Sequence, residues 1–94
     1  CLILRYDTQG NFLWVHQDSR AGSFRGIISN DDAAYALGGS SGMCGLTKIT
    51  NDGTVAWQTS IIGDSLAILN NVLYVANNSN VIYRYDALTG SALP

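Results

Sequence analysis

The amino-acid sequence predicts an all-β fold of antiparallel strands, and three observations support this prediction. Glycine, serine and asparagine are abundant, whereas glutamate is absent and lysine and proline occur once each. Such a composition favours turns and strands over helices. Short apolar or alternating runs recur every 8–12 residues or so, with turn formers between them, which is typical of all-β chains. In addition, a unit of about forty residues repeats along the chain.

The opening stretch predicts a β-hairpin. Residues 2–6 and 11–16 alternate in side-chain character and should form its two strands. Asp7 and Gly10 bound the turn, because aspartate can bond its own backbone and glycine accepts a positive φ. With strict alternation, the side chains that share a face are Leu2, Leu4 and Tyr6 on the first strand, and Phe12, Trp14 and His16 on the second.

Seven further strands follow from the same signals, giving nine. They are expected at residues 24–29, 33–37, 44–49, 54–61, 66–69, 72–76 and 81–85. Turns are expected at residues 30–32, at Asp52-Gly53 and at Asn70-Asn71. Asp-Gly between apolar strands is among the stronger hairpin signals.

The repeat is visible around the two tryptophans. Trp14 and Trp57 stand 43 residues apart, and at that offset residues 1–14 align with residues 44–57 without a gap. A third copy begins at Arg84 and stops before any tryptophan. A period near forty with four strands per period is typical of a blade of a β-propeller.

The sequence therefore predicts that residues 1–94 form a partial β-propeller of about two blades, each a four-stranded antiparallel sheet. With the strands of a blade lettered A to D, residues 1–17 supply C and D of one blade. Residues 24–61 form a complete blade, and residues 65–94 supply A to C of the next. Flanking blades have uncovered faces that promote association. The expected partners are further blades, from the same longer chain or from other copies.

Three stretches carry a resemblance to known repeats. Residues 6–14 and 34–40 resemble the bacterial β-propeller repeat of large secreted and surface proteins. Residues 82–90 are similar to the repeat of quinoprotein-like propellers, which bind pyrroloquinoline quinone (PQQ). The resemblance covers nearly all of the chain and implies the propeller fold, while such repeats serve as scaffolds in many unrelated proteins.

The resemblance also implies roles for individual residues. Trp14 and Trp57 would pack between blades, and Asp7, Asp86, Thr89 and Gly90 would form hydrogen bonds in the turns. Thr50 departs from this pattern, because the other two copies have aspartate there. Residues 92–94 stand where a quinoprotein repeat has its last tryptophan, so that tryptophan is missing.

The two cysteines, Cys1 and Cys44, occupy equivalent positions in successive repeats. Equivalent positions in stacked sheets lie about 10 Å apart, whereas a disulfide needs Cα atoms within about 7 Å. We therefore expect two free, half-buried thiols. An alternative for Cys1 is the lipid-bearing first residue of a mature bacterial lipoprotein.

Charge and hydropathy exclude some partners. The net charge is −2 and the basic residues are scattered, which is a poor match to nucleic acid. No apolar run approaches the roughly 20 residues that a membrane span needs.

Candidate sites are few, and each has a plain structural alternative. His16 is expected at the rim without a catalytic partner. Asp31-Asp32 and residues 51–53 could offer oxygens to calcium, but more often form solvated turns. Residues 77–79 fit the N-glycosylation acceptor pattern. Four tyrosines could line a sugar-binding surface: Tyr35, Tyr74, Tyr83 and Tyr85. More often such residues pack between blades, and Tyr35 and Tyr74 are expected to do so.

These observations favour a non-catalytic structural or interaction module of a secreted or surface bacterial protein, at an extracellular, cell-surface or periplasmic location. No cofactor is expected. One alternative is a fragment of a quinoprotein-like, PQQ-dependent enzyme whose active site lies on other blades. Another is a carbohydrate-binding propeller.

Overall fold

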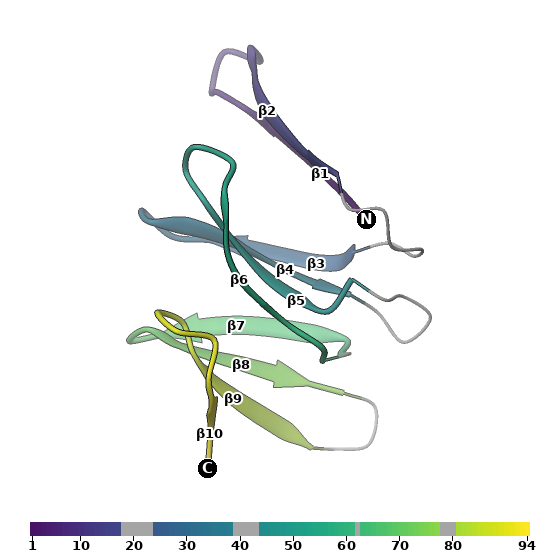
Figure 1. Ribbon diagram of the computed structural model, residues 1–94, viewed down its shortest axis with the longest axis vertical. Coiled ribbons are helices and arrows are strands. Elements are labelled where there is room, and N and C mark those ends of the chain that lie inside the picture. The colour runs from purple at the N-terminus through teal and green to yellow at the C-terminus, as the bar shows by residue number, and fades with distance from the viewer. Residues whose placement is uncertain (18–23, 39–43, 62, 78–80) are drawn as a thin grey trace.

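The computed structural model describes residues 1–17, 24–38, 44–61, 63–77 and 81–94, and these residues form antiparallel strands in three sheets (Figure 1). The all-β prediction is confirmed. The strands are β1 (Leu2–Tyr6), β2 (Phe12–Gln17), β3 (Phe24–Ser29), β4 (Ala33–Gly38), β5 (Leu46–Thr50), β6 (Val55–Thr59), β7 (Ser65–Leu69), β8 (Val72–Ala76), β9 (Ile82–Asp86) and β10 (Ala92–Leu93). No described segment forms a helix that could cross a membrane.

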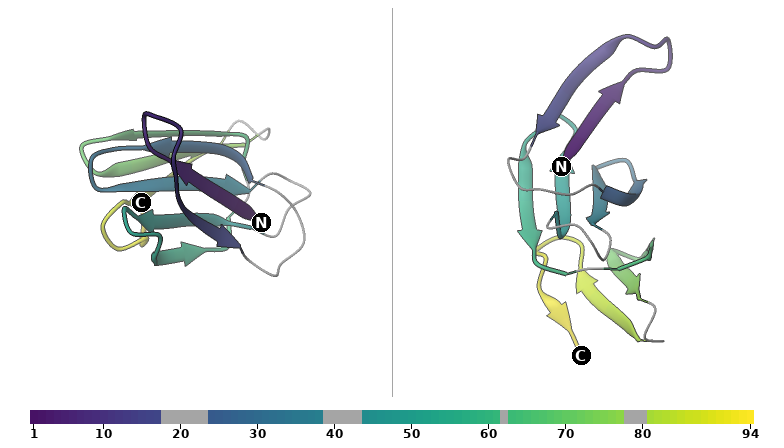
Figure 2. Two further views of the ribbon diagram at one scale, coloured as in Figure 1. Left: turned by 90° about the horizontal axis from the view of Figure 1, so that it is seen from above. Right: turned by 90° about the vertical axis from the view of Figure 1, so that its right-hand side faces the viewer.

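The three sheets lie one after another along the longest axis of the molecule, which measures 39 Å. The first sheet is the hairpin β1-β2, the middle sheet has the order β3-β4-β5-β6, and the last has the order β7-β8-β9-β10. Figure 2 shows that the sheets form an open, curved row and do not close on one another. The first and last sheets therefore each have a face that no other described sheet covers.

The turns follow the expected residue types. Gly10 and Gly53 have φ values of 85° and 93°, which a side chain rarely adopts. The turn between β7 and β8 places Asn70 and Asn71 at φ 51° and 61°. Asparagine is among the few residues other than glycine that tolerate this region. A two-residue turn of this kind matches the twist of the strands it joins.

The described residues contain ten strands, one more than the nine predicted. The additional strand, β10, has only two residues and pairs with β9, with Leu93 opposite Arg84. Residues 92–94 are too few to show an alternating pattern, so this strand could not be predicted from the sequence.

The larger hydrophobic core lies between the middle and last sheets. Tyr35, Leu37 and Leu46 of the middle sheet are buried against Leu73 and Val75 of the last sheet. A smaller core joins the hairpin to the middle sheet, where Ile3 packs against Ala36 and Ile49. The hairpin and the last sheet thus cover the two faces of the middle sheet. Over β3 this cover is incomplete.

Cys1 and Cys44 form a disulfide, so the prediction of two free thiols was wrong. Their Cα atoms are 5.8 Å apart. The spacing of about 10 Å holds for sheets that run face to face, whereas the hairpin lies at an angle to the middle sheet. The two come together at the end where the N-terminus lies (Figure 1). The disulfide therefore ties the first repeat to the second.

Candidate functional site

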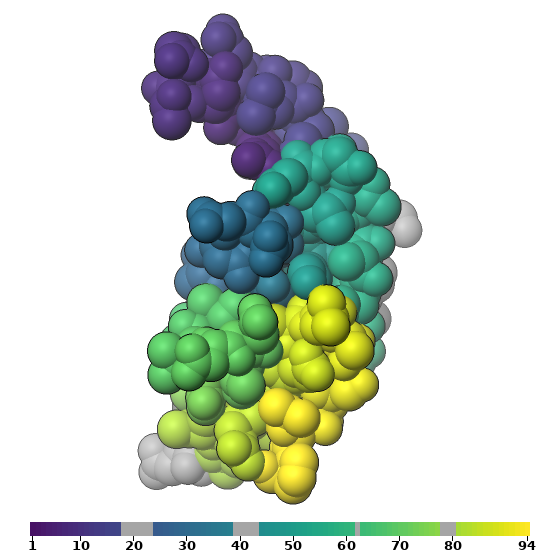
Figure 3. Space-filling model, turned by 90° about the vertical axis from the view of Figure 1, so that its left-hand side faces the viewer, coloured from purple at the N-terminus to yellow at the C-terminus, as the bar shows by residue number. Residues whose placement is uncertain are grey.

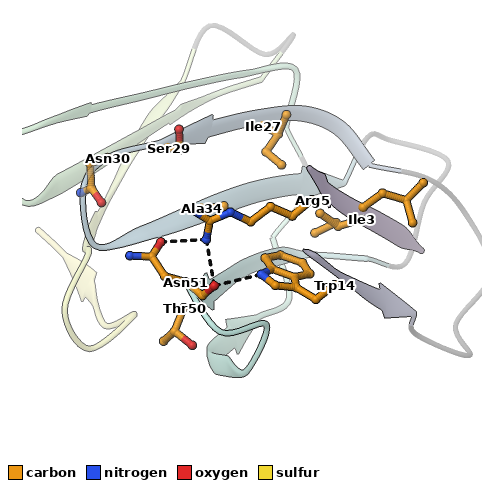
Figure 4. A pocket seen from close by; sticks show the side chains of 10 residues that line it. Ile3, Arg5, Trp14, Ile27, Ser29, Asn30, Ala34, Thr50 and Asn51 are labelled. Carbon is orange, nitrogen blue, oxygen red and sulfur yellow. Dashed lines mark hydrogen bonds between the residues drawn. The ribbon is translucent and has the colours of Figure 1, made fainter. Parts of the chain in front are cut away.

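The most distinctive arrangement is the contact between the hairpin and the middle sheet. The indole Nε1 of Trp14 donates a hydrogen bond of 3.0 Å to the backbone carbonyl of Asn51. Arg5 Nη1 donates to the same carbonyl at 2.9 Å and to Asn51 Oδ1 at 3.1 Å (Figure 4). The indole face lies on Gly53, where a Cβ would stand 3.0 Å from Trp14 Cγ. An indole, a cation, a turn carbonyl and a glycine thus form one unit.

The same unit joins the middle sheet to the last sheet. Trp57 Nε1 and Lys48 Nζ each donate a hydrogen bond of 3.0 Å to the carbonyl of Ala87. A Cβ on Gly90, which has φ 78°, would stand 2.6 Å from Trp57 Cδ2. Glycine is therefore required here both by backbone conformation and by the indole that occupies the place of a side chain.

Strand pairing brings the cation and the indole together. Arg5 pairs with Trp14, and Lys48 pairs with Trp57. In both hairpins the register shifts by one residue just after the basic residue. Without this bulge, Leu13 would lie opposite Arg5 and the indole would face away from the middle sheet.

The same bulge corrects the expected faces of the second strand. Phe12 and Trp14 do not share a face, because Phe12 pairs with Tyr6 on the outer side of the hairpin. The rings of Tyr6 and Phe12 meet edge to face, with centroids 5.8 Å apart. Strict alternation along residues 11–16 predicted otherwise, since a sequence pattern does not reveal where a bulge inserts an extra residue.

Tyr35 supports the second junction. Its buried ring lies 6.2 Å from the ring of Trp57, and Lys48 Nζ lies 5.6 Å from its centroid. The nearly buried lysine is thus stabilised by a carbonyl and by the face of an aromatic ring. Tyr74 occupies the equivalent place in the last sheet and is only half-buried, because no described sheet lies over it.

Aspartates hold the turns that carry the acceptor carbonyls. Asp7 accepts hydrogen bonds from the backbone N–H groups of Gln9 and Asn11. The Asn11 N–H is the largest cause of a pKa of Asp7 below its usual value. In the middle copy, where Thr50 replaces the aspartate, Asp52 accepts from the Thr50 hydroxyl and the Thr54 N–H. The Thr50 hydroxyl lowers the pKa of Asp52 most.

The third copy of the turn uses the first arrangement. The carboxylate of Asp86 accepts from the N–H of Leu88 at 2.8 Å, and its carbonyl accepts from the N–H of Gly90 at 2.7 Å. The N–H of Ala87 donates to the carbonyl of Asn71, which ties this turn to the turn between β7 and β8.

A groove runs beside the first junction, where the hairpin leaves part of the middle sheet uncovered (Figure 3). One cavity of about 190 Å³ is bounded by Arg5, Trp14 and Asn51 at its polar end and by Ile3 and Ile27 at its apolar end. A shallower one of about 350 Å³ continues between β1 and β3. On β7 the residue equivalent to Ile27 is Leu66, which packs into the core.

The remaining candidate residues are not brought together. Within the described residues, no three histidine, cysteine or acidic side chains lie close enough to hold a metal ion. His16 pairs with Ile3, and its Nε2 is buried with no hydrogen-bond partner in the described part of the chain. Asp31 and Asp32 lie in an exposed turn. Of the glycosylation pattern at 77–79, residues 78 and 79 lie outside the described residues.

The last two tyrosines, Tyr83 and Tyr85, are two residues apart on β9 and lie on the same face of the last sheet as their partners Val75 and Leu73. Tyr83 is exposed, whereas Tyr85 packs against the larger core. Burial raises the pKa of Tyr85, and the neighbouring Tyr83 adds to this effect. Tyr74 lies on the other face of the last sheet and Tyr35 is buried, so the four tyrosines do not form one continuous surface.

Comparison of the chain with protein-family models, with curated proteins and with solved structures found no significant match.

Proposed function

We propose that this chain is a non-catalytic structural and interaction module of a secreted or cell-surface β-propeller protein. One observation carries the proposal: the same unit of indole, cation, carbonyl and glycine joins sheet to sheet at both junctions. Packing between sheets accounts for Trp14, Trp57 and Tyr35, which are the most conspicuous side chains in the sequence. A contact that recurs from sheet to sheet suits a scaffold that is extended by repetition.

The blade assignment rests on the sheets themselves. The middle and last sheets each have four antiparallel strands in sequence order, as a propeller blade does. In the middle sheet, within residues 24–61, all four strands have five or six residues, whereas the fourth strand of the last sheet, β10, has only two. The hairpin supplies the two outer strands of the preceding blade. Further blades come from the same longer chain or from other copies of it.

The disulfide supports an oxidising location. Cys1 and Cys44 are bonded to each other, and such bonds persist mainly outside the cytosol, in secreted, surface and periplasmic proteins. Trapping of thiols with an alkylating agent in freshly harvested material tests this. The expected result is that both cysteines are protected until a reductant is added. Alkylation of both without reductant would argue against the proposed location.

Electron microscopy of the purified protein, combined with its native mass, tests the propeller. The expected particles are rings of radially arranged sheets, formed by one longer chain or by several copies. A 10.1 kDa monomer that unfolds cooperatively would contradict the proposal. If the sheets are blades that need neighbours, an open row of them should not be stable alone.

A further inference from the structure

The turn that supplies the glycine and the acceptor carbonyl of the inter-sheet unit occurs three times in the chain. Gly10, Gly53 and Gly90 have φ values of 85°, 93° and 78°, and each N–H donates to the carbonyl of the residue that opens its turn. The residue after that opening position supplies the acceptor carbonyl at both filled junctions, namely Asn51 and Ala87. In the first turn this residue is Thr8.

The first of these three turns has no indole lying on its glycine. A Cβ on Gly53 would meet Trp14 at 3.0 Å and one on Gly90 would meet Trp57 at 2.6 Å, whereas a Cβ on Gly10 would meet nothing within 4 Å. No described side chain donates to the Thr8 carbonyl. The turn is nevertheless held in the same shape, with Asp7 accepting from Gln9 and Asn11. The acceptor is thus formed in advance of any partner.

We propose that the turn from Asp7 to Gly10 is a docking site for a β-hairpin of a further repeat, one that carries a tryptophan directly opposite an arginine or lysine. This inference rests on the proposed function and specifies the partner that the first sheet accepts. The indole would lie on Gly10, and both its N–H and the cation would donate to the Thr8 carbonyl, as at Asn51 and Ala87.

The surface next to this turn fits the same occupant. Tyr6 is 53% exposed, whereas Ile49, its equivalent in the middle sheet, is fully buried beneath the hairpin. Leu4 is also exposed, and its equivalent Thr47 is buried. An incoming hairpin would therefore cover apolar area beside the turn, as β1 and β2 cover the middle sheet.

The other end of this chain offers only half of the required chemistry. Arg84 is the exposed equivalent of Arg5 and Lys48, but the residue opposite it is Leu93 in place of a tryptophan. A second copy could supply the cation and no indole N–H. A repeat with tryptophan at that position is therefore the better occupant, and this chain can be converted into one.

The test is Leu93→Trp in the full chain, with self-association measured by sedimentation velocity. The variant should associate about tenfold more tightly than the wild type, because it gains a hydrogen bond and a buried ring. Adding Gly10→Asn should remove this gain. Asparagine tolerates a positive φ, its Cβ has open space there, and its side chain blocks the glycine face. Leu88→Trp is the matched control, since Leu88 is 75% exposed and lies in a turn away from Arg84.

Three results would overturn the docking site: no gain from Leu93→Trp, an equal gain from Leu88→Trp, or a gain that persists with Gly10→Asn. Circular dichroism of Gly10→Asn alone checks that the strands remain. The proposed function is judged separately, by whether the wild type forms rings. Rings that form and are insensitive to these substitutions would remove the docking site and leave the module intact.

Discussion

At the scale of single residues, glycine has two structural roles at the junctions. Gly53 and Gly90 allow a positive φ, and they also leave room for the ring of a tryptophan from the preceding sheet. Gly10 shares the first property and, within the described residues, not the second. The chain therefore contains its own control for separating backbone strain from packing.

Gly90→Ala should destabilise the protein more than Gly10→Ala. Both substitutions force alanine into a positive φ, which costs about 1 kcal/mol. At Gly90 the new Cβ would also lie 2.6 Å from Trp57, and overpacking of this kind costs about 1–3 kcal/mol more. Urea denaturation of both variants measures the difference. Equal losses of stability would mean that the indole does not occupy that place.

At the scale of elements, the turn of each repeat copy is held by an aspartate, namely Asp7, Asp52 or Asp86. Asp7 accepts backbone N–H groups in its charged form, which holds its pKa below the usual value. A carboxylate with a lowered pKa contributes stability that is complete above the unfolded pKa of about 3.9 and is lost as the pH falls through the folded pKa. The first turn should therefore weaken in acid.

Thermal unfolding from neutral pH to below pH 4 or so tests this dependence. The wild type should lose melting temperature in the acid range, and Asp7→Asn should lose less over the same interval because it has no charge to lose there. Asp31→Asn, at an exposed position in another turn, is the control and should follow the wild type. Identical pH profiles for all three proteins would exclude the Asp7 effect.

The disulfide is the other device at this scale, since it ties the hairpin to the middle sheet across 43 residues of sequence. Closing a loop of this length stabilises the folded state by about 4 kcal/mol in the chain-entropy account. Replacing both cysteines with alanine should lower the urea midpoint accordingly, and a reductant should then have no further effect. An unchanged midpoint in the double variant would show that the hairpin is held by its other contacts alone.

Much of the element order was predictable from the sequence, because strands such as Leu2–Tyr6 and Val72–Ala76 have clear patterns between clear turns. The candidate site was predictable only in part. Matching positions showed that Trp14 and Trp57 are equivalent, but the bulge that turns each toward its basic partner has no sequence signature. The disulfide was missed because equivalent positions do not fix the angle between two sheets, and only that angle brings Cys1 near Cys44.

At the scale of the whole molecule, the two outer faces of the row carry exposed apolar residues, some of them at positions that are buried in the middle sheet. Ile82 of the last sheet is 66% exposed, whereas its equivalent in the middle sheet, Leu46, is fully buried. The hairpin likewise exposes Leu2, Leu4 and Phe12 on its outer side. Exposed apolar side chains of this kind favour association.

Purified chain should therefore show an average mass that rises with concentration, and Ile82→Lys should shift it toward the monomer. A charge on that face would have to be desolvated in the complex, which is costly. Leu88→Lys is the control, since it adds the same charge at a residue that is already 75% exposed and lies in a turn. Light scattering across a dilution series measures the effect. A mass that does not vary with concentration in the wild type would count against association through these faces.

The contact at each junction is directional, because one sheet gives the indole and the cation while the next gives the carbonyl and the glycine. Two molecules related by a two-fold axis would present like groups to each other, so this contact builds no symmetric dimer. Repetition of this contact gives either a closed ring, in which every acceptor turn is filled, or a filament, in which one acceptor turn stays open at one tip. The rotation from one sheet to the next decides between these outcomes, and a single open tip gives such a filament only one end at which a tryptophan hairpin can add.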